Sequence, residues 1–436
     1  MSQQSNILVA TTALRKQRIS GARLIAACTI GNALEFFDFV VFSFFAATIG
    51  KLFFPAANPT TQLLLSFATY GVGFFLRPFG GIVLGAYADR RGRKRATILT
   101  LMLMALGTLM IGLAPTYAQI GYFGPLAIVI GRLVQGFSAG GEVGASTTLL
   151  SESAPVEQRG FYGSWQLASQ GLAVLAAAGI AFAINSTMTH AAVISWGWRV
   201  PFVSGILIVP LGLWLRSALE ETHANEDDAK TAQVSSLLAV FSGHWRRLLL
   251  GVMLIVGGTA ANAIIVLYMA TYAVSQLHMS PASGLLAGLM AGIVTLIAAP
   301  MAGALSDRIG RRMVAGASYL LIALLIYPAF LLLNTSATIF TLLAVVAVLG
   351  TLNATGGAPA ITSLTEIFPA PVRATGMSLV YALGVAIFGG FGQFIVTWLI
   401  RALATPIAPA YYVIACCLSS LIALLLLPET ARKPLN

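Results

Sequence analysis

The sequence predicts an all-α membrane protein with twelve transmembrane helices in two six-helix, pseudo-symmetric halves. Three observations lead to this fold class. Of the 436 residues, 58% are hydrophobic and only 9% are charged, with a mean hydropathy of +0.88, whereas a soluble globular domain carries about 25% charged residues. Apolar runs of about 20 residues, the length that spans a bilayer as a helix, recur along the chain. A motif between two such runs also recurs half a chain length later.

Six apolar runs precede the middle of the chain and six follow it. The runs are longer than the strands of a transmembrane barrel and are continuous rather than alternating, so they are predicted as helices. The first six lie near residues 22–49, 62–87, 96–115, 123–150, 160–187 and 198–217. The second six lie near residues 247–274, 282–306, 312–333, 337–364, 374–401 and 408–427.

One long polar stretch separates the sixth predicted helix from the seventh. Its charged residues are Glu220, Glu221, Glu226, Asp227, Asp228 and Lys230. We therefore expect three parts: an N-terminal six-helix half over residues 1–218, a cytoplasmic linker loop over residues 219–243, and a C-terminal six-helix half over residues 244–436.

The basic residues predict the orientation in the membrane. A net charge of +11 by itself could indicate a nucleic-acid partner. With both termini inside, however, 20 of the 25 Lys and Arg residues fall in cytoplasmic segments, as the positive-inside rule requires. Of the others, Lys51, Arg199 and Arg401 fall at outer helix ends, and Arg77 and Arg132 fall inside spans. We expect a multi-pass protein of the cell (inner) membrane with cytoplasmic termini and no nucleic-acid partner.

Two motifs recur in the two halves. Residues 85–95 (GAYADRRGRKR) recur as residues 303–312 (GALSDRIGRR). In a second motif, Glu152, Pro155, Arg159 and Ser164 correspond to Glu366, Pro369, Arg373 and Ser378. Two matches in the same order, at equivalent points between helices, indicate a duplicated unit. Duplicated halves are typical of secondary transporters, whose substrate site lies between the two repeats.

The repeated Gly-x-x-x-Asp-Arg-x-Gly-Arg-Arg/Lys loop resembles the signature loop of the major facilitator superfamily. Further segments resemble its metabolite:H⁺ symporter branch: residues 31–39 (GNALEFFDF), 75–81 (FLRPFGG), 131–136 (GRLVQG), 140–142 (GGE) and 197–202 (GWRVPF). Residues 161–170 (FYGSWQLASQ) are similar to the citrate and tricarballylate carriers within that branch. The resemblance covers nearly the whole chain and implies the fold of the superfamily and secondary transport.

The repeated loop supplies a predicted conformational gate. Glycines at 85 and 303 allow two helices to pack closely. Asp89 and Asp307 stand at helix boundaries, where a carboxylate can accept hydrogen bonds from the N-terminus of a neighbouring helix. The resemblance implies that this contact holds the cytoplasmic face shut and breaks when the carrier opens inward. The predicted gate comprises Gly85, Asp89, Arg93, Gly303, Asp307 and Arg311.

Ionisable residues inside the spans are expected to be functional, because the bilayer makes them costly. They are Glu35, Asp38, Arg77, Arg132 and Glu142. Asp38 and Arg132 lie at similar depth, which predicts a protonatable carboxylate beside a fixed arginine; a static ion pair is the alternative. Glu35 is a further candidate for substrate or coupling-ion binding. Arg77 and Glu142 are assigned to the gate, Arg77 with a structural role and Glu142 with its role open.

Several neutral polar residues also fall in predicted helices. Asn32 is expected to line a cavity rather than face lipid. Gln166 and Gln170 can present amide donors to a carboxylate ligand, or equally can form hydrogen bonds between helices. Tyr268 and Asn353 are polar exceptions in the apolar second half and are weaker candidates for the substrate site.

The resemblance predicts import of a small organic acid, a citrate- or tricarballylate-like di- or tricarboxylate, in symport with H⁺ or Na⁺ by alternating access. The ionisable residues in the spans sum to −1 when all are charged, so an anion needs the acids neutralised or Arg401 turned inward. Arg401 is expected instead to extend to the outer interface. The alternatives are a dicarboxylate such as 2-oxoglutarate and a zwitterionic osmolyte such as proline or betaine. The ammonium of an osmolyte would need aromatic rings, for example those of Phe36, Phe37, Trp165 and Tyr268.

Other functional classes find little support in the sequence. No ring of equivalent pore residues indicates a channel, and no nucleophile motif or phosphate-binding loop indicates an enzyme or an ATP-driven pump. The four histidines, His190, His223, His244 and His278, lack metal-ligand spacing. We therefore expect no metal and no cofactor beyond the coupling ion. The expected partners are a small-molecule organic anion and the lipid bilayer, with the protein as a monomer.

Overall fold

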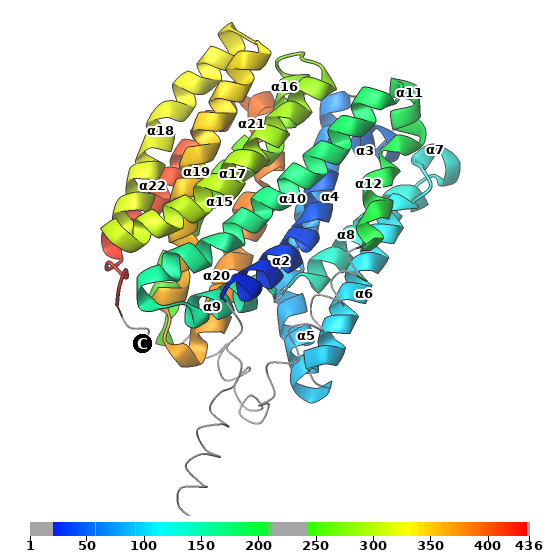
Figure 1. Cartoon of the computed structure of the whole chain (residues 1–436). Coiled ribbons are helices and arrows are strands. Elements are labelled where there is room, and N and C mark those ends of the chain that lie inside the picture. The colour runs from blue at the N-terminus through cyan, green and yellow to red at the C-terminus, as the bar shows by residue number, and fades with distance from the viewer. Residues whose placement is uncertain are drawn as a thin grey trace, which may run out of the picture.

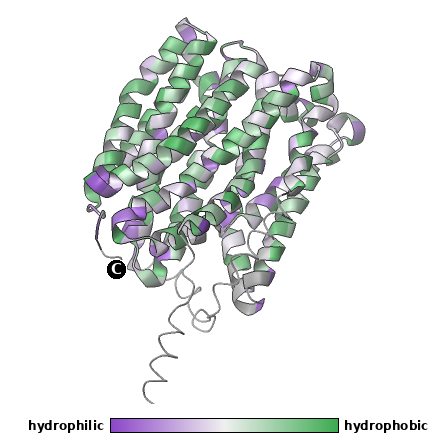
Figure 2. Cartoon of the chain, in the orientation of Figure 1, coloured by the Kyte–Doolittle hydropathy of each residue, from purple (hydrophilic) through white to green (hydrophobic). Residues whose placement is uncertain are grey.

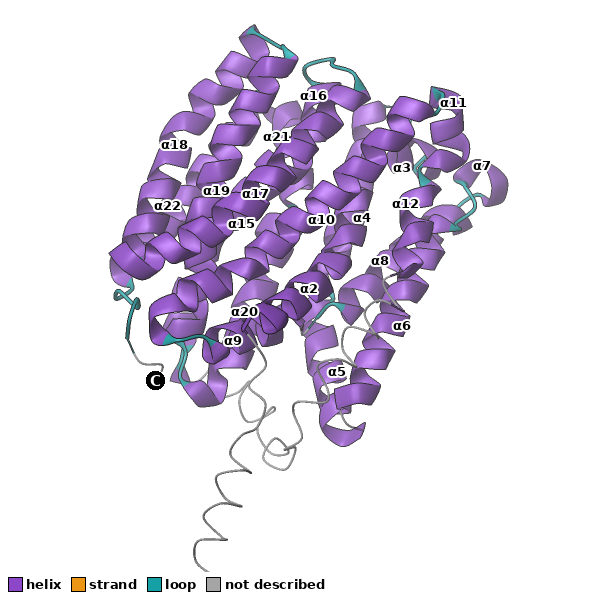
Figure 3. Ribbon diagram, in the orientation of Figure 1, coloured by secondary structure: helices purple, strands orange, loops and turns teal. Residues whose placement is uncertain are grey.

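The computed structural model describes residues 21–56, 58–91, 93–140, 142–207, 210 and 243–433. Regular structure within these ranges is entirely helical (Figure 3), and the predicted all-α class is confirmed. The predicted linker, residues 219–243, lies outside the described residues except for its last position. The predicted gate residues Gly85, Asp89 and Arg93, together with Glu142, are described only as parts of their helices, and their side chains lie outside the described part of the chain.

The N-terminal half contains the first five predicted spans and the start of the sixth. The first span is divided at Phe45 into α2 (Gly21–Phe44) and α3 (Ala46–Phe53), and the second at Leu76 into α4 (Pro59–Phe75) and α5 (Arg77–Arg91). The rest of this half comprises α6 (Arg93–Gly112), α7 (Tyr117–Ile120), α8 (Phe123–Ser138), α9 (Glu142–Ser153), η1 (Val156–Gln158), α10 (Arg159–Thr187), α11 (His190–Ala192), η2 (Val193–Gly197), α12 (Arg199–Ser204) and η3 (Gly205–Leu207).

The C-terminal half contains the remaining six spans. They comprise α15 (Trp245–Ala261), η4 (Asn262–Tyr268), α16 (Met269–Ser275), α17 (Pro281–Ile309), α18 (Arg311–Thr335), α19 (Ile339–Ile367), η5 (Ala370–Val372), α20 (Arg373–Gly384), η6 (Val385–Gly390), α21 (Gly392–Leu403) and α22 (Ala408–Leu426). The segments η4 and η6 are π-helical turns inside the seventh and eleventh spans, and such turns are frequent at functional sites.

Polar residues just before a helix fix where several spans begin. The Asn58 side chain accepts a hydrogen bond from the backbone N–H of Thr60 at 2.8 Å, with a proline in the first turn of α4. The Ser280 hydroxyl caps α17 in the same way, again before a proline. The Thr338 hydroxyl accepts from the N–H of Thr341 at 3.1 Å and begins α19. Each side chain satisfies a donor that the helix leaves unpaired.

Length and hydropathy agree with a membrane location. Nine helical spans in the described residues are long and apolar enough to cross a bilayer, and Ile98–Gly112 and Phe123–Ser138 are shorter apolar helices. Together they account for eleven of the twelve predicted spans; the sixth is described only in part. Figure 2 shows hydrophobic residues along the helices, with hydrophilic residues gathered at helix ends and connecting turns. Large apolar side chains such as Leu324 and Leu425 are exposed, as lipid-facing residues are.

The two halves meet along α10 and α17, which pack against each other over most of their length (Figure 1). Glycines allow the backbones to touch. A Cβ on Gly171 would lie 2.6 Å from the backbone nitrogen of Leu296, and a Cβ on Gly292 would lie 2.7 Å from that of Leu175. Close approach through small residues is the usual way in which helices associate in membranes.

Candidate functional site

A cavity lies between the two halves and is lined by both. One wall is aromatic and comes from α2 and α4; it is formed by Phe36, Phe39, Tyr70 and Phe74. Further lining residues include Gln170 of α10 and, from the C-terminal half, Asn262, Tyr319, Asn353 and Tyr381. A cavity at the interface of two repeats is the position in which secondary transporters bind their substrates.

Two of the predicted substrate-site residues reach this cavity. Gln170 Nε2 donates a hydrogen bond to Tyr381 Oη at 3.1 Å, which joins the two halves across the cavity. Asn353 is buried and lines the wall, and its Oδ1 atom has no hydrogen-bond partner in the described structure. Tyr381 was not predicted, although a tyrosine within an apolar span is the same signal that singled out Tyr268.

Asn32 and Gln166 do not line the cavity, which corrects the expectation for Asn32. Gln166 Nε2 donates to Asn32 Oδ1 at 3.0 Å, and Asn32 Nδ2 donates to the Ser169 hydroxyl. Both side-chain amides are therefore hydrogen-bonded within the contact between α2 and α10. This is the alternative of helix-to-helix hydrogen bonding, and it leaves only Gln170 of the predicted glutamine pair facing the cavity.

Tyr268 and Arg401 also lie away from the cavity. The Tyr268 ring packs on Phe67, with 5.8 Å between centroids, and its hydroxyl accepts from Thr397 at 3.2 Å. Arg401 is exposed, and its Nη1 atom lies 3.5 Å from the Thr61 hydroxyl. Arg401, which was kept in reserve as an inward-turning cation, therefore does not reach the cavity in this structure. A snorkelling arginine at a helix end explains its position.

Asp38 and Arg132 are both completely buried, but they form no direct ion pair within the described structure. Gln135 lies between them: its Nε2 donates to Asp38 Oδ2 at 3.3 Å, and its Oε1 accepts from Arg132 Nη1 at 2.7 Å. The Thr108 hydroxyl also donates to Asp38 Oδ2. The expected carboxylate–arginine pair is thus a relay through a glutamine. Gln135 could have been found in the sequence, since it stands three residues after Arg132 on one helix face.

Arg132 packs against aromatic rings as well. Its Cζ atom lies 4.3 Å from the ring centroid of Phe42, 4.7 Å from that of Phe39 and 5.0 Å from that of Tyr70. Two of these rings line the cavity. Its Nε and Nη2 atoms have no hydrogen-bond partner in the described structure. The cation is therefore held directly behind the aromatic wall.

Arg77 lies behind the same wall, which corrects its assignment to the cytoplasmic gate. Its Cζ atom is 4.1 Å from the ring centroid of Phe74, 4.6 Å from that of Phe39 and 5.8 Å from that of Phe36. All three rings line the cavity. Glu35, on the same stretch of α2, is buried and interacts electrostatically with Arg77.

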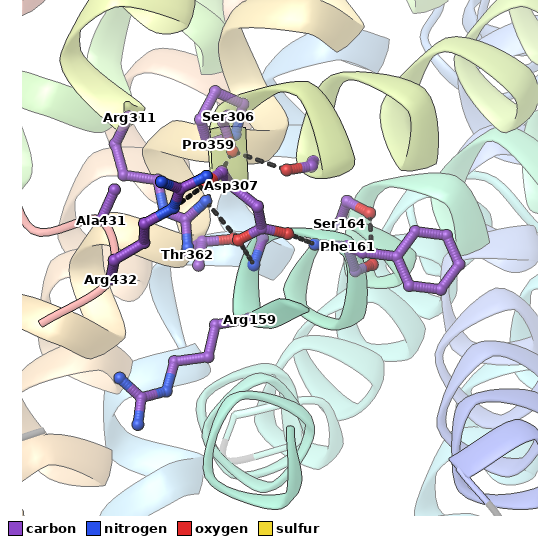
Figure 4. Close-up of polar contacts among 12 residues, drawn as sticks. Arg159, Phe161, Ser164, Ser306, Asp307, Arg311, Pro359, Thr362, Ala431 and Arg432 are labelled. Atoms are coloured by element: carbon purple, nitrogen blue, oxygen red, sulfur yellow. Dashed lines mark hydrogen bonds and ion pairs between the residues drawn. The ribbon is translucent and has the colours of Figure 1, made fainter. Parts of the chain in front are cut away.

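The end of the bundle that carries residues 427–433, here called the tail end, is closed by charged residues (Figure 4). Asp307 accepts hydrogen bonds from the backbone N–H groups of Gly160, at 2.8 Å, and Phe161, at 2.9 Å. These groups begin α10 of the other half, so the contact implied by the family loop is present for Asp307. Arg311 pairs with Asp307 at 2.8 Å and with Glu366 at 3.1 Å.

Two further contacts join the halves at the tail end. Arg373 pairs with Glu152 at 2.6 Å, and the Thr365 hydroxyl donates to that of Ser151 at 3.0 Å. Gly303 lies directly against the start of α10, where a Cβ would meet the backbone. Residues of the second copy of the first motif and of both copies of the second motif therefore meet in one layer.

The C-terminal tail adds to this layer. Glu429 accepts from the backbone N–H groups of Arg311, at 2.9 Å, and Arg312, at 3.0 Å, and so caps α18. Arg159 of the other half donates to the Lys433 carbonyl at 2.7 Å. Burial acts to raise the pKa of Glu429, but hydrogen bonds from four backbone N–H groups outweigh burial and hold this pKa below its usual range.

The opposite end of the bundle, here called the far end, is closed too. Gln393 Nε2 donates to the Ser43 hydroxyl at 2.8 Å, linking α21 to α2. The contact between Phe67 and Tyr268 also joins the two halves. The two halves are therefore in contact on both sides of the cavity.

Two related helical halves around an interface cavity define a secondary transporter of the major facilitator superfamily. The chain belongs to the sugar (and other) transporter family, whose model matches residues 24–225 and again residues 215–436. It is therefore a multi-pass membrane transporter and not an enzyme.

Known relatives and structures agree with this assignment. The chain is 40% identical over 405 residues to a citrate-proton symporter of Klebsiella pneumoniae, covering 92% of this chain and 91% of the relative. It is 34% identical over 428 residues to the proline/betaine transporter of Salmonella typhimurium, covering 95% and 85%. The fold matches that of the xylose transporter XylE from E. coli, with a TM-score of 0.74 at 18% identity, over 94% of this chain and 98% of that one.

Proposed function

We propose that the protein is a symporter that imports a small organic di- or tricarboxylate, citrate-like in chemistry, together with H⁺ by alternating access. The observation that carries this proposal is the aromatic wall of the interface cavity, against which the guanidinium groups of Arg77 and Arg132 pack. These two cations attract an anionic substrate once the charges of the nearby acids Glu35 and Asp38 are neutralised or displaced, because charges are weakly screened away from water. The name of the 40%-identical relative supports the same substrate class.

The wall argues against a zwitterionic osmolyte. A quaternary ammonium would be recognised by the faces of aromatic rings, but the rings of Phe39, Tyr70 and Phe74 already pack on guanidinium groups. A second cation there would be repelled. Asp38, which could attract a cation, does not line the cavity and bonds to Thr108 and Gln135 instead. The carboxylate proposal is therefore preferred over the osmolyte.

We assign coupling to the Asp38–Gln135–Arg132 relay. A proton on Asp38 removes the negative charge that Gln135 and Thr108 now solvate, and Gln135 is then free to turn and release Arg132. Carboxylate protonation and the position of the arginine are thereby linked. The site offers one carboxylate with neutral hydrogen-bond donors around it, so H⁺ is proposed, and Na⁺ is the alternative that the experiment below separates.

Alternation is assigned to the tail-end layer. The Asp307 contact with the start of α10 holds that end shut, and opening it would expose the cavity to the same side. From the distribution of basic residues, we place this side and both termini in the cytoplasm of a cell whose inner membrane holds the protein as a monomer. The division into residues 1–218, 219–243 and 244–436 is kept, supported by the two matches of the family model.

Reconstitution into liposomes tests these assignments. We expect radiolabelled citrate or tricarballylate to accumulate when the proton concentration is higher outside the liposomes than inside, and not under a Na⁺ gradient alone. Unlabelled 2-oxoglutarate and glycine betaine are added as competitors to define the substrate class. Accumulation of betaine with no uptake of any carboxylate would contradict the proposal, and uptake driven only by Na⁺ would replace H⁺ as the coupling ion.

A further inference from the structure

We propose that Arg77 and Tyr381, from opposite halves, form a binding site for one carboxylate group of the transported substrate. The proposal rests on the function proposed above and names the residues that select the anion. The sequence assigned Arg77 to the gate and did not single out Tyr381, and neither residue takes part in the relay or in the tail-end contacts.

Arg77 has unused donors in a place where donors are normally paired. Its side chain is 3% exposed, and its Nε and Nη1 atoms have no hydrogen-bond partner in the described structure. An arginine that only supports the fold would have its donors bonded, as Arg311 does, because an unpaired buried charge is destabilising. A carboxylate is the ligand whose geometry and charge suit a guanidinium.

Tyr381 brings a second donor from the other half. Its hydroxyl oxygen lines the cavity and accepts a hydrogen bond from Gln170. The described residues offer no acceptor for its own hydrogen. Arg77 begins α5 and Tyr381 lies on α20, and these two helices pack against each other. The guanidinium and the hydroxyl also interact electrostatically. One carboxylate can therefore accept from both, and binding then joins the two halves.

The aromatic wall separates the guanidinium from the cavity in this conformation. Of the three rings around Arg77, that of Phe36 is the farthest, at 5.8 Å, and is only partly buried. Phe36 is therefore the ring that moves aside when a carboxylate reaches Arg77. Without substrate, the nearby Glu35 balances the positive charge of the Arg77 guanidinium. When substrate binds, its carboxylate balances this charge in place of Glu35.

The test measures binding separately from transport. Purified protein in detergent is titrated with tricarballylate by calorimetry. Arg77→Gln is expected to weaken binding about 10- to 100-fold, the range for a charge-assisted hydrogen bond. Tyr381→Phe, which keeps the ring, is expected to weaken it about fivefold to tenfold. Arg246→Gln, at an exposed arginine, and Tyr412→Phe, at a hydroxyl bonded to Phe388 outside the cavity, are the controls and should bind as the wild type does.

A ligand series gives a readout that a merely structural role would not change. The monoamide of tricarballylate lacks one negative charge, so the wild type should prefer tricarballylate, and Arg77→Gln should lose most of that preference. Gel filtration and thermal unfolding check that each variant folds. If Arg77→Gln does not fold, Arg77→Lys, which keeps the charge without the guanidinium, and Tyr381→Phe carry the test.

The outcomes separate the two proposals. Wild-type protein that binds glycine betaine and no carboxylate would overturn both the proposed function and this site. Wild-type protein that binds tricarballylate, with Arg77 and Tyr381 variants that bind it equally well and keep the preference over the monoamide, would overturn the site alone. Weakened binding in these variants with unchanged binding in the controls supports the site.

Discussion

The buried arginines of the two regions are held in opposite ways. At the tail end, Arg311 is 1% exposed and bonds through all three side-chain nitrogens to Ser306, Asp307 and Glu366. Behind the cavity wall, Arg77 and Arg132 are similarly buried but pack against aromatic rings. Each has two side-chain nitrogens without a hydrogen-bond partner in the described structure. Equal burial therefore accompanies very different degrees of hydrogen bonding.

This difference distinguishes arginines that stabilise one conformation from arginines whose donors can still bind a substrate or a rearranged side chain. A fully bonded ion pair stabilises one arrangement of the helices and is lost when that arrangement changes. Unpaired buried donors lower stability and gain a partner only when substrate or a rearranged side chain arrives.

The largest effect is expected in the relay. Asp38→Asn removes the titrating carboxylate, and Arg132→Ala removes the cation to which it is linked through Gln135. Both should abolish accumulation of substrate against its gradient in liposomes. Asp38→Asn should retain exchange of substrate across the membrane, because the neutral amide mimics the protonated acid. Glu157→Gln, at an exposed acid, is the matched control. Normal accumulation by Asp38→Asn would remove this residue from the coupling assignment.

The second prediction compares the two kinds of arginine directly. Arg311→Met leaves Asp307 and Glu366 without their cation and should lower the free energy of unfolding by about 3–5 kcal/mol. Arg77→Met fills the same space with an apolar chain and should leave stability unchanged or raise it, while uptake is lost. Unfolding midpoints in detergent measure both. Equal losses of stability would contradict the distinction.

The third prediction concerns the closing contact. Asp307→Asn weakens charge-assisted hydrogen bonds to the start of α10. Such bonds contribute about 1.5 kcal/mol or more, so the conformation with a closed tail end should become about tenfold less populated. Transport passes through this conformation and should slow, with substrate affinity nearly unchanged. Arg308→Gln, at an exposed neighbour, is the control. A loss of binding equal to the loss of transport would argue against a purely conformational role.

The smallest effect is expected at the tail. The pKa of Glu429 is held low in the folded protein, so its stabilisation is present above the unfolded value of about 4.3 and is lost as the pH falls through the folded pKa. Glu429→Gln should slightly lower the melting temperature at pH 7, and the difference from wild type should disappear at low pH. The effect is small because the group is partly solvated. A difference that grows as the pH falls would contradict this assignment.

The fold was predictable because its signals are local and repeated. Apolar runs gave the spans within a few residues, as for α18, predicted near residues 312–333 and observed at Arg311–Thr335. The duplicated motifs predicted two related halves. The breaks at Phe45 and Leu76 were not predicted. Phe45 has no proline or glycine beside it, whereas Pro78 stands two residues after Leu76 and is a signal for the second break.

The candidate site was less predictable, because it depends on which helix faces meet. Polarity alone selected Asn32 and Gln170 equally, yet Asn32 finds a partner on α10 and Gln170 reaches the cavity. Arg77 was placed by its depth near the gate, and only the packing of Phe36, Phe39 and Phe74 around it reveals its place behind the wall. The rotation of each helix about its axis determines which of its polar side chains face the cavity. An almost uniformly apolar span has no polar face from which this rotation could be predicted.

The glycine contact between α10 and α17 has a mechanical consequence. Gly171 touches α17 near the middle of α10, about 16 Å along the helix from Gly160. If the two helices tilt about that contact, parting the tail end by about 3 Å needs a tilt of roughly 10° on an arm of that length. The same tilt presses the far ends of the helices together. Tilting about this contact therefore couples opening at one end of the protein to closure at the other, so the cavity cannot open to both sides of the membrane at once.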